Sequence, residues 1–244
     1  MGEKNLFRGA ADLIDPKNIM LTSEEMEQCR EFSIKSADTQ QEIEFEDKTT
    51  KPRTKEEIAR DNLIGKIAEV AFSKLMKENY GIDLALDFEN YPRGRWDSQD
   101  AIINGWRIDV KGTRTGGQWL LIEWNKLNFR QKDDKLSHVY IMFTVGWNRF
   151  TDTPTGSARF EGFATLARLR DGVPCTEVLK KGTKLPGKEV ILQTDNFGIQ
   201  YHDLYKFPYD LNELLQKYVP DQKLTDDYKN PRTGETTRER LKKH

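Results

Sequence analysis

The chain has 244 residues, of which 36% are hydrophobic and 32% charged, and its formal net charge is −1. This composition predicts a folded chain with a sizeable core, and a nearly neutral chain must meet any anionic partner through a local patch. No apolar run is long enough to span a membrane, and the first residues lack an apolar signal core, so we expect a cytoplasmic protein with no membrane partner. The two cysteines, Cys29 and Cys175, lie far apart in the sequence, which argues against a zinc site.

Residues 1–50 are predicted to form an N-terminal extension that is partly acidic between Glu24 and Asp47. Acidic runs of this kind are typical of a solvated helix followed by a loop. The alternative is an arm that covers a basic groove or takes part in a dimer.

A long helix is predicted from Thr54 to Gly81. Thr54 and Glu57 have the spacing of a capping box, apolar residues then recur at the helical period, and Gly81 is typical of a helix end. Glu69 lies at the border of the apolar stripe, so it is neither plainly solvated nor plainly part of the core.

Beyond this helix the hydrophobic period changes to two, which is typical of strands. The predicted strands are "LALDF", the two arms around Asn104-Gly105, "QWLLIEW", "HVYIMFTV" and "RFEGFAT". A short helix or helical loop is predicted in "NKLNFRQKDDKL", and a C-terminal helix in "YDLNELLQKYV". This order predicts an α/β domain over residues 51–220, with a central mixed β-sheet flanked by helices, followed by a polar tail over residues 221–244.

Asn104-Gly105 between two alternating segments predicts a hairpin with a two-residue type I′ turn. In that register Ile103 faces Trp106, and Asp100 faces Asp109. One face of the hairpin is then wholly apolar, with Ala101, Ile103, Trp106, Ile108 and Val110. The other face carries Asp100, Ile102, Arg107, Asp109 and Lys111.

Two opposed carboxylates repel each other by ~1 kcal/mol at 4 Å in water, and by several times more in a partly dry cleft. A magnesium ion would relieve this repulsion, because Mg²⁺ binds one or two carboxylates together with waters and substrate phosphate. The hairpin alone leaves two interpretations open: a metal site, or a solvated face on which Arg107 and Lys111 neutralise the two aspartates.

Asp100, the segment Ile108-Asp109-Val110-Lys111 and a preceding helix with Glu69 together resemble the PD-(D/E)XK nuclease superfamily, most of all its small phage and bacterial members. The resemblance covers residues 54–145 and implies a restriction-endonuclease-like core. The proline that the family name places before the first aspartate is absent here. Asp97 is a rival for the first ligand, but in this register it falls beyond the paired strand.

The resemblance implies that Asp100, Asp109 and the backbone carbonyl of Val110 bind a metal ion. It also implies that Lys111 orients or deprotonates the attacking water and stabilises the transition state. Glu69 would match a glutamate that lies near the metal in this family, and it could support a second ion. The implied cofactor is Mg²⁺, with Mn²⁺ as a substitute.

Cationic residues around the hairpin are predicted to contact the phosphates of a nucleic acid. They are Arg93, Arg95, Arg107, Arg114, Lys126 and Arg130, and Gln118 opens the next strand toward the same edge. The resemblance implies a DNA endonuclease that leaves 5′-phosphate and 3′-hydroxyl ends, and fold analogy suggests a homodimer. The alternatives are an RNase, a nuclease for single strands or branched structures, and a nucleic-acid-binding module without chemistry.

Overall fold

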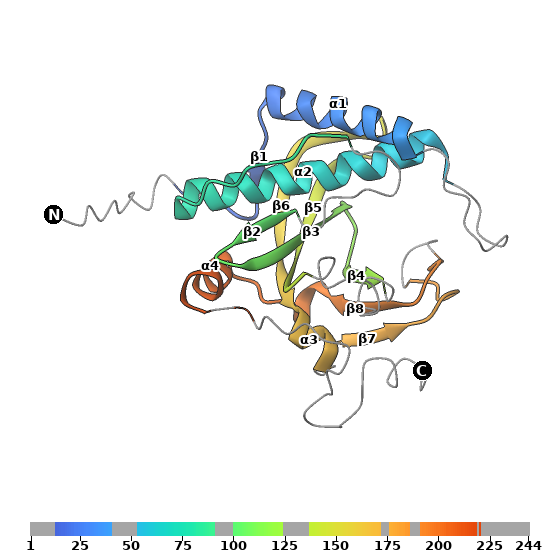
Figure 1. Cartoon of the computed structure of the whole chain (residues 1–244). Coiled ribbons are helices and arrows are strands. Elements are labelled where there is room, and N and C mark those ends of the chain that lie inside the picture. The colour runs from blue at the N-terminus through green and yellow to red at the C-terminus, as the bar shows by residue number, and fades with distance from the viewer. Residues whose placement is uncertain are drawn as a thin grey trace.

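The structure is a computed structural model, and it describes residues 13–40, 53–90, 100–123, 137–171, 176–185, 191–218 and 220. Two stacked helices lie over a β-sheet, and a second, smaller sheet lies on the other side (Figure 1). The elements are β1 (Ile19–Met20), α1 (Ser23–Gln40), α2 (Lys55–Tyr80), β2 (Ala101–Ile103), β3 (Trp106–Arg114), β4 (Trp119–Glu123), β5 (Val139–Asn148), β6 (Thr153–Thr165), α3 (Leu166–Asp171), β7 (Thr176–Leu179), β8 (Asn196–Gln200), η4 (Tyr201–Asp203) and α4 (Pro208–Lys217).

The larger sheet has the strand order β1-β6-β5-β3-β2. Strands β3 and β5 run parallel, whereas the other neighbouring pairs are antiparallel. The predicted α/β class with a mixed sheet and helices is therefore confirmed. The smaller sheet, with the order β4-β8-β7, was not predicted.

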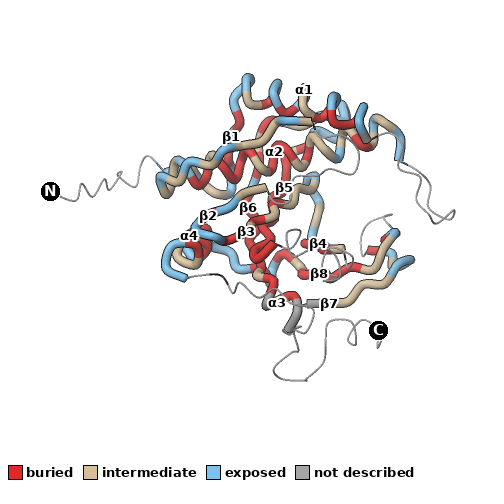
Figure 2. Tube along the Cα trace, in the orientation of Figure 1, coloured by how far each residue is buried: buried red, intermediate tan, exposed pale blue. Residues whose placement is uncertain are grey.

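Each face of the larger sheet has its own core. Helix α2 covers one face, and α1 packs on the outer side of α2, so that the most buried part of the chain lies between α2 and the sheet (Figure 2). Gly112 permits this close approach, because a Cβ atom there would lie 2.6 Å from the carbonyl oxygen of Ile64. On the opposite face, Tyr140 and Met142 of β5 pack against Leu120 of the second sheet.

Helix α2 has the ends that its sequence predicts. The Thr54 hydroxyl accepts the backbone N–H of Glu57 at 3.2 Å, and the Glu57 carboxylate accepts the N–H of Thr54 at 2.8 Å. Gly81 ends the helix in the left-handed conformation, with φ of 70°. The capping box and the glycine stop are both confirmed.

The predicted strand "LALDF" is wrong, because residues 81–90 run back along α2 outside either sheet. The Ser73 hydroxyl donates to the carbonyl of Leu84 at 3.3 Å, and the Lys66 ammonium donates to that of Asp87 at 2.7 Å. Leu84 and Phe88 pack against the core from one side. The alternating pattern therefore reflects an extended segment whose partner is a helix.

Part of the predicted N-terminal extension belongs to the core. Ile19 pairs with Ala158 of β6, and Cys29 of α1 is fully buried. Residues 1–12 and 41–50, the segment "NKLNFRQKDDKL" and the tail over residues 221–244 lie outside the described residues. None of the helices that the structure describes is both long and apolar enough to cross a membrane.

Candidate metal-binding site

The β2–β3 hairpin has the predicted turn and register. Asn104 and Gly105 have φ angles of 48° and 81°, the left-handed conformations that a type I′ turn requires. Ile103 pairs with Trp106, and the amide of Asn104 donates to the carbonyl of Leu215 at 3.0 Å. Helix α4 therefore holds the turn in place.

Strand β2 is too short to pair with all of β3, and no other described strand pairs with β3 on this side, which we call the open edge. Its pairing with β3 ends at Ala101, opposite Ile108. Beyond that point Oδ2 of Asp100 accepts the backbone N–H of Val110 at 2.6 Å, in place of a strand carbonyl. Because the N–H and C=O of a strand residue point to the same side, the Val110 carbonyl also faces this edge.

Asp109 and Lys111 lie on the face of β3 that is turned toward the second sheet, since they pair with Tyr140 and Met142. The Lys111 ammonium forms an ion pair with Oδ1 of Asp109, and the two side chains are 28% and 17% exposed. Apart from Lys111, no described residue donates a hydrogen bond to that oxygen. The Asp109 carboxylate therefore depends on Lys111 at this oxygen.

The charges at this edge are unbalanced in favour of the carboxylates. Burial raises the pKa of Asp100 to about 8, and repulsion by Asp109 and Glu69 adds to the effect. Burial lowers the pKa of Lys111, but attraction to Asp109 and Asp100 outweighs it, so the net shift is upward. A divalent cation at this edge would reduce the repulsion between the carboxylates that contributes to these pKa shifts.

Glu69 reaches the same region from α2, but a lysine already engages it. Lys66, only 5% exposed, donates to Oε2 of Glu69 at 2.5 Å, and its ammonium lies 4.3 Å from the centre of the Phe32 ring. Burial raises the pKa of Glu69, Lys66 opposes this shift, and Asp109 adds to it. Glu69 is therefore repelled by the charge of Asp109 while its carboxylate remains bonded to Lys66.

The donor atoms at the edge fit Mg²⁺ in number and kind. Asp100 and Asp109 supply two carboxylates and Val110 a carbonyl, all hard oxygen donors. In the described part of the chain no three Asp, Glu, His or Cys side chains gather closely enough to hold a metal ion, so Glu69 is not a third ligand of such a group. Two carboxylates are nevertheless the usual protein contribution to a Mg²⁺ site.

The predicted nucleic-acid contacts divide into three groups. Arg107 lies on β3, on the same face as Asp109 and Lys111. Arg114 lies at the far end of β3 and forms an ion pair with Asp152 at 3.2 Å, while Gln118 is exposed beyond the β3–β4 turn. The other four predicted contacts, Arg93, Arg95, Lys126 and Arg130, lie outside the described residues, as does Asp97, the rival for the first metal ligand.

Two residues near the site were missed by the sequence analysis. Lys66 precedes Glu69 by three positions, a helical spacing that brings side chains together and could have pointed to the pair. Glu123 ends β4, and its negative charge raises the pKa of Lys111. This effect is smaller than those of burial and of the two aspartates. Only the packing of β4 against the larger sheet shows that Glu123 is near, and no local pattern carries that information.

Comparison with known proteins gives no match: no family model, no curated protein and no solved structure is significantly similar to this chain. The residues around the open edge of β3 therefore carry the functional argument by themselves.

Proposed function

We propose that this protein is a Mg²⁺-dependent nuclease with a PD-(D/E)XK site, acting on DNA and leaving 5′-phosphate and 3′-hydroxyl ends. The observation that carries the proposal is the open edge of β3, where Asp100, the Val110 backbone and Asp109 meet, with Lys111 paired to Asp109. Partly buried carboxylates that repel each other around a lysine destabilise a fold, and this arrangement is typical of sites for metal-assisted phosphoryl chemistry.

The order of elements supports a restriction-endonuclease-like core. Helix α2 carries Glu69, the hairpin carries Asp100, Asp109 and Lys111, and β5 then runs parallel beside β3. This is the helix, hairpin and further-strand order that the resemblance implies. The second sheet and α1 would then be additions around this core.

In the proposed mechanism Asp100, Asp109 and the Val110 carbonyl would hold a metal ion at the edge of the sheet. A Mg²⁺ ion there would supply Lewis acidity toward the scissile phosphate and would offset the charge that develops on its oxygens. The Val110 N–H fixes the Asp100 carboxylate through a bond of 2.6 Å. Asp109 fixes the Lys111 ammonium, which can donate to a phosphate oxygen or to the attacking water.

The proposal is tested by cleavage assays on Asp109→Asn and Lys111→Met with Mg²⁺ or Mn²⁺. Each change removes one charge at the open edge, and we expect cleavage to fall by at least about 100-fold. Asp83→Asn is the matched control, because Asp83 also forms an ion pair with a lysine, Lys77 at 3.1 Å, but is exposed and away from the site. Its activity should equal that of the wild type.

The assay should use duplex, single-stranded and branched DNA, together with RNA of the same sequence. Wild-type activity in both site variants, with folding verified by circular dichroism, would contradict the assignment of the site. A wild-type protein that binds these polymers but cuts none of them would instead favour a nucleic-acid-binding module.

A further inference from the structure

The turn between β5 and β6 presents one aromatic side chain that packs against none of the described residues. Phe150 is fully exposed, at 101% of its reference area, and it is the most exposed large hydrophobic residue in the described part of the chain. Exposing one apolar residue needs no explanation by itself. However, the turn that carries Phe150 is held by several hydrogen bonds, and arginines lie around it.

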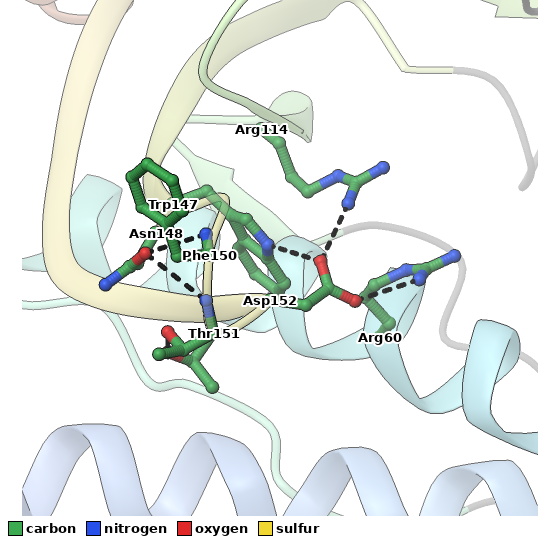
Figure 3. A network of polar contacts seen from close by, with 8 residues as sticks. Arg60, Arg114, Trp147, Asn148, Phe150, Thr151 and Asp152 are labelled. Atoms are coloured by element: carbon green, nitrogen blue, oxygen red, sulfur yellow. Dashed lines mark hydrogen bonds and ion pairs between the residues drawn. The ribbon is translucent and has the colours of Figure 1, made fainter.

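Side-chain hydrogen bonds hold the turn at its tip and at its base. The side-chain oxygen of Asn148 accepts the backbone N–H groups of Phe150 at 2.9 Å and Thr151 at 3.4 Å. Below it, the ring N–H of Trp147 donates to Oδ1 of Asp152 at 2.8 Å, which closes the base of the turn (Figure 3). The aromatic ring is therefore presented on a preorganised turn, which reduces the entropy lost on binding.

Arginines from three separate elements meet around this turn. Arg60 of α2 and Arg114 of β3 both bond to the carboxylate of Asp152, at 3.4 Å and 3.2 Å (Figure 3). The Arg149 side chain lies against the β3–β4 turn, where its Nη2 atom is 3.2 Å from the position that a Cβ atom of Gly116 would take. Three arginines around one aspartate leave this patch cationic.

A cationic patch with a single projecting ring fits a nucleic acid better than an apolar protein surface. Every base has a face on which an aromatic ring can stack, and arginines beside it can bind the flanking phosphates. A protein partner would require a contiguous apolar area, but the neighbours of Phe150 in sequence are Arg149 and Thr151. A base inside a duplex must first be unstacked at a cost of a few kcal/mol, whereas an unpaired base offers its face directly.

The patch and the candidate metal site lie on opposite faces of β3. Arg114 follows Asp109 by five residues, which spans about 17 Å along the strand at a rise of ~3.3 Å per residue. Because five is an odd number, the Arg114 side chain lies on the face that α2 covers, whereas Asp109 and Lys111 lie on the face toward the second sheet. A polymer that contacts both must therefore pass around the edge or the end of β3.

We propose that Phe150 stacks on an unpaired base of the nucleic-acid substrate, while Arg60, Arg114 and Arg149 bind the phosphates beside it. This inference rests on the proposed function, and it narrows the substrate to nucleic acid with unpaired bases. It also assigns the β5–β6 turn as a binding element that the sequence analysis did not identify.

The test measures the affinity of the full chain for a fluorescently labelled single strand and for the blunt duplex of the same sequence, with chelator present to prevent cleavage. Phe150→Ala should weaken binding of the single strand about tenfold and of the duplex less than about twofold, because the loss is one stacking contact. Phe150→Trp should retain the affinity, whereas Phe150→Leu should behave like Phe150→Ala. Phe207→Ala is the matched control, since Phe207 is also an exposed phenylalanine, at 67%, before α4.

The outcomes separate this inference from the proposed function. Unchanged single-strand affinity in Phe150→Ala, equal losses on strand and duplex, or full affinity in Phe150→Leu would each overturn the stacking contact and leave the nuclease proposal standing. The expected pattern of affinities, without cleavage of any substrate by the wild type in Mg²⁺, would support stacking and overturn the nuclease proposal. A wild type that binds neither polymer would overturn the stacking contact, and cleavage by the wild type in Mg²⁺ would then decide the nuclease proposal separately.

Discussion

At the scale of single residues, the carboxylate of Asp100 is the clearest sign of function. It replaces a missing strand carbonyl by accepting the Val110 N–H, and an asparagine could make the same bond. The charge of Asp100 is therefore not needed for the fold. The charge of Asp100 is unfavourable in the folded protein, as its raised pKa indicates. Burial is the main cause of the raised pKa, and the negative charges of Asp109 and Glu69 raise it further.

Asp100→Asn should stabilise the metal-free protein at pH 8 by about 2 kcal/mol, or about 6 °C in Tm, because it removes a charge that burial and then the repulsion by Asp109 and Glu69 disfavour, and it keeps the hydrogen bond. The folded protein binds the Asp100 proton more tightly than the unfolded chain, whose ordinary pKa is 3.8. Metal-free wild-type stability should therefore fall as the pH rises from about 4 to about 8, and the advantage of the variant should vanish below about pH 4.

Thermal unfolding across this pH range, with and without Mg²⁺, measures both effects. Saturating Mg²⁺ should raise the Tm of the wild type but not that of Asp100→Asn. A variant that is less stable than the metal-free wild type at pH 8 would show that the charge of Asp100 serves the fold instead.

At the scale of elements, the hairpin turn decides which side chains reach the open edge. A slip of one residue would move Asp109 and Lys111 to the face that α2 covers. The turn is fixed by Asn104 and Gly105, which adopt positive φ, and by the bond from Asn104 to α4. The proposed activity therefore depends on a turn whose side chains take no part in the chemistry.

Gly105→Ala should destabilise the protein by about 1–2 kcal/mol, because φ of 81° is unfavourable for alanine. Added bulk contributes little, since the new Cβ would lie 3.7 Å from the nearest atom of Pro220, an ordinary contact. Urea unfolding measures the change. The control is Gly65→Ala inside α2, where nothing lies within 4 Å and alanine should stabilise by about 0.5–1 kcal/mol. Equal stability of Gly105→Ala and wild type would refute this account of the turn.

At the scale of the whole molecule, the sequence predicted those features that depend on residues close together in the chain. The caps of α2 at Thr54 and Gly81 and the register around Asn104 follow from local geometry. The second sheet could not be predicted in this way, because Thr176 of β7 pairs with Ile199, 23 residues later. Long-range packing also decided that residues 81–90 pair with no strand.

The candidate site shows the same division between local and long-range information. The opposition of Asp100 and Asp109 follows from the turn, whereas the bond from Asp100 to the Val110 backbone depends on where β2 ends. The capture of Glu69 by Lys66 depends on the depth of α2 in the core and on the rings of Phe32 and Phe88. Sequence therefore identified the charged residues at the edge but not the bonds that hold them.

The most direct test of the central claim is anomalous diffraction from crystals of the wild-type protein soaked in Mn²⁺. We expect one strong anomalous peak between the carboxylates of Asp100 and Asp109, within coordination distance of the Val110 carbonyl, and no peak in Asp109→Asn crystals. Wild-type crystals without a peak at this edge, and with the Lys111–Asp109 ion pair unchanged, would contradict the metal site.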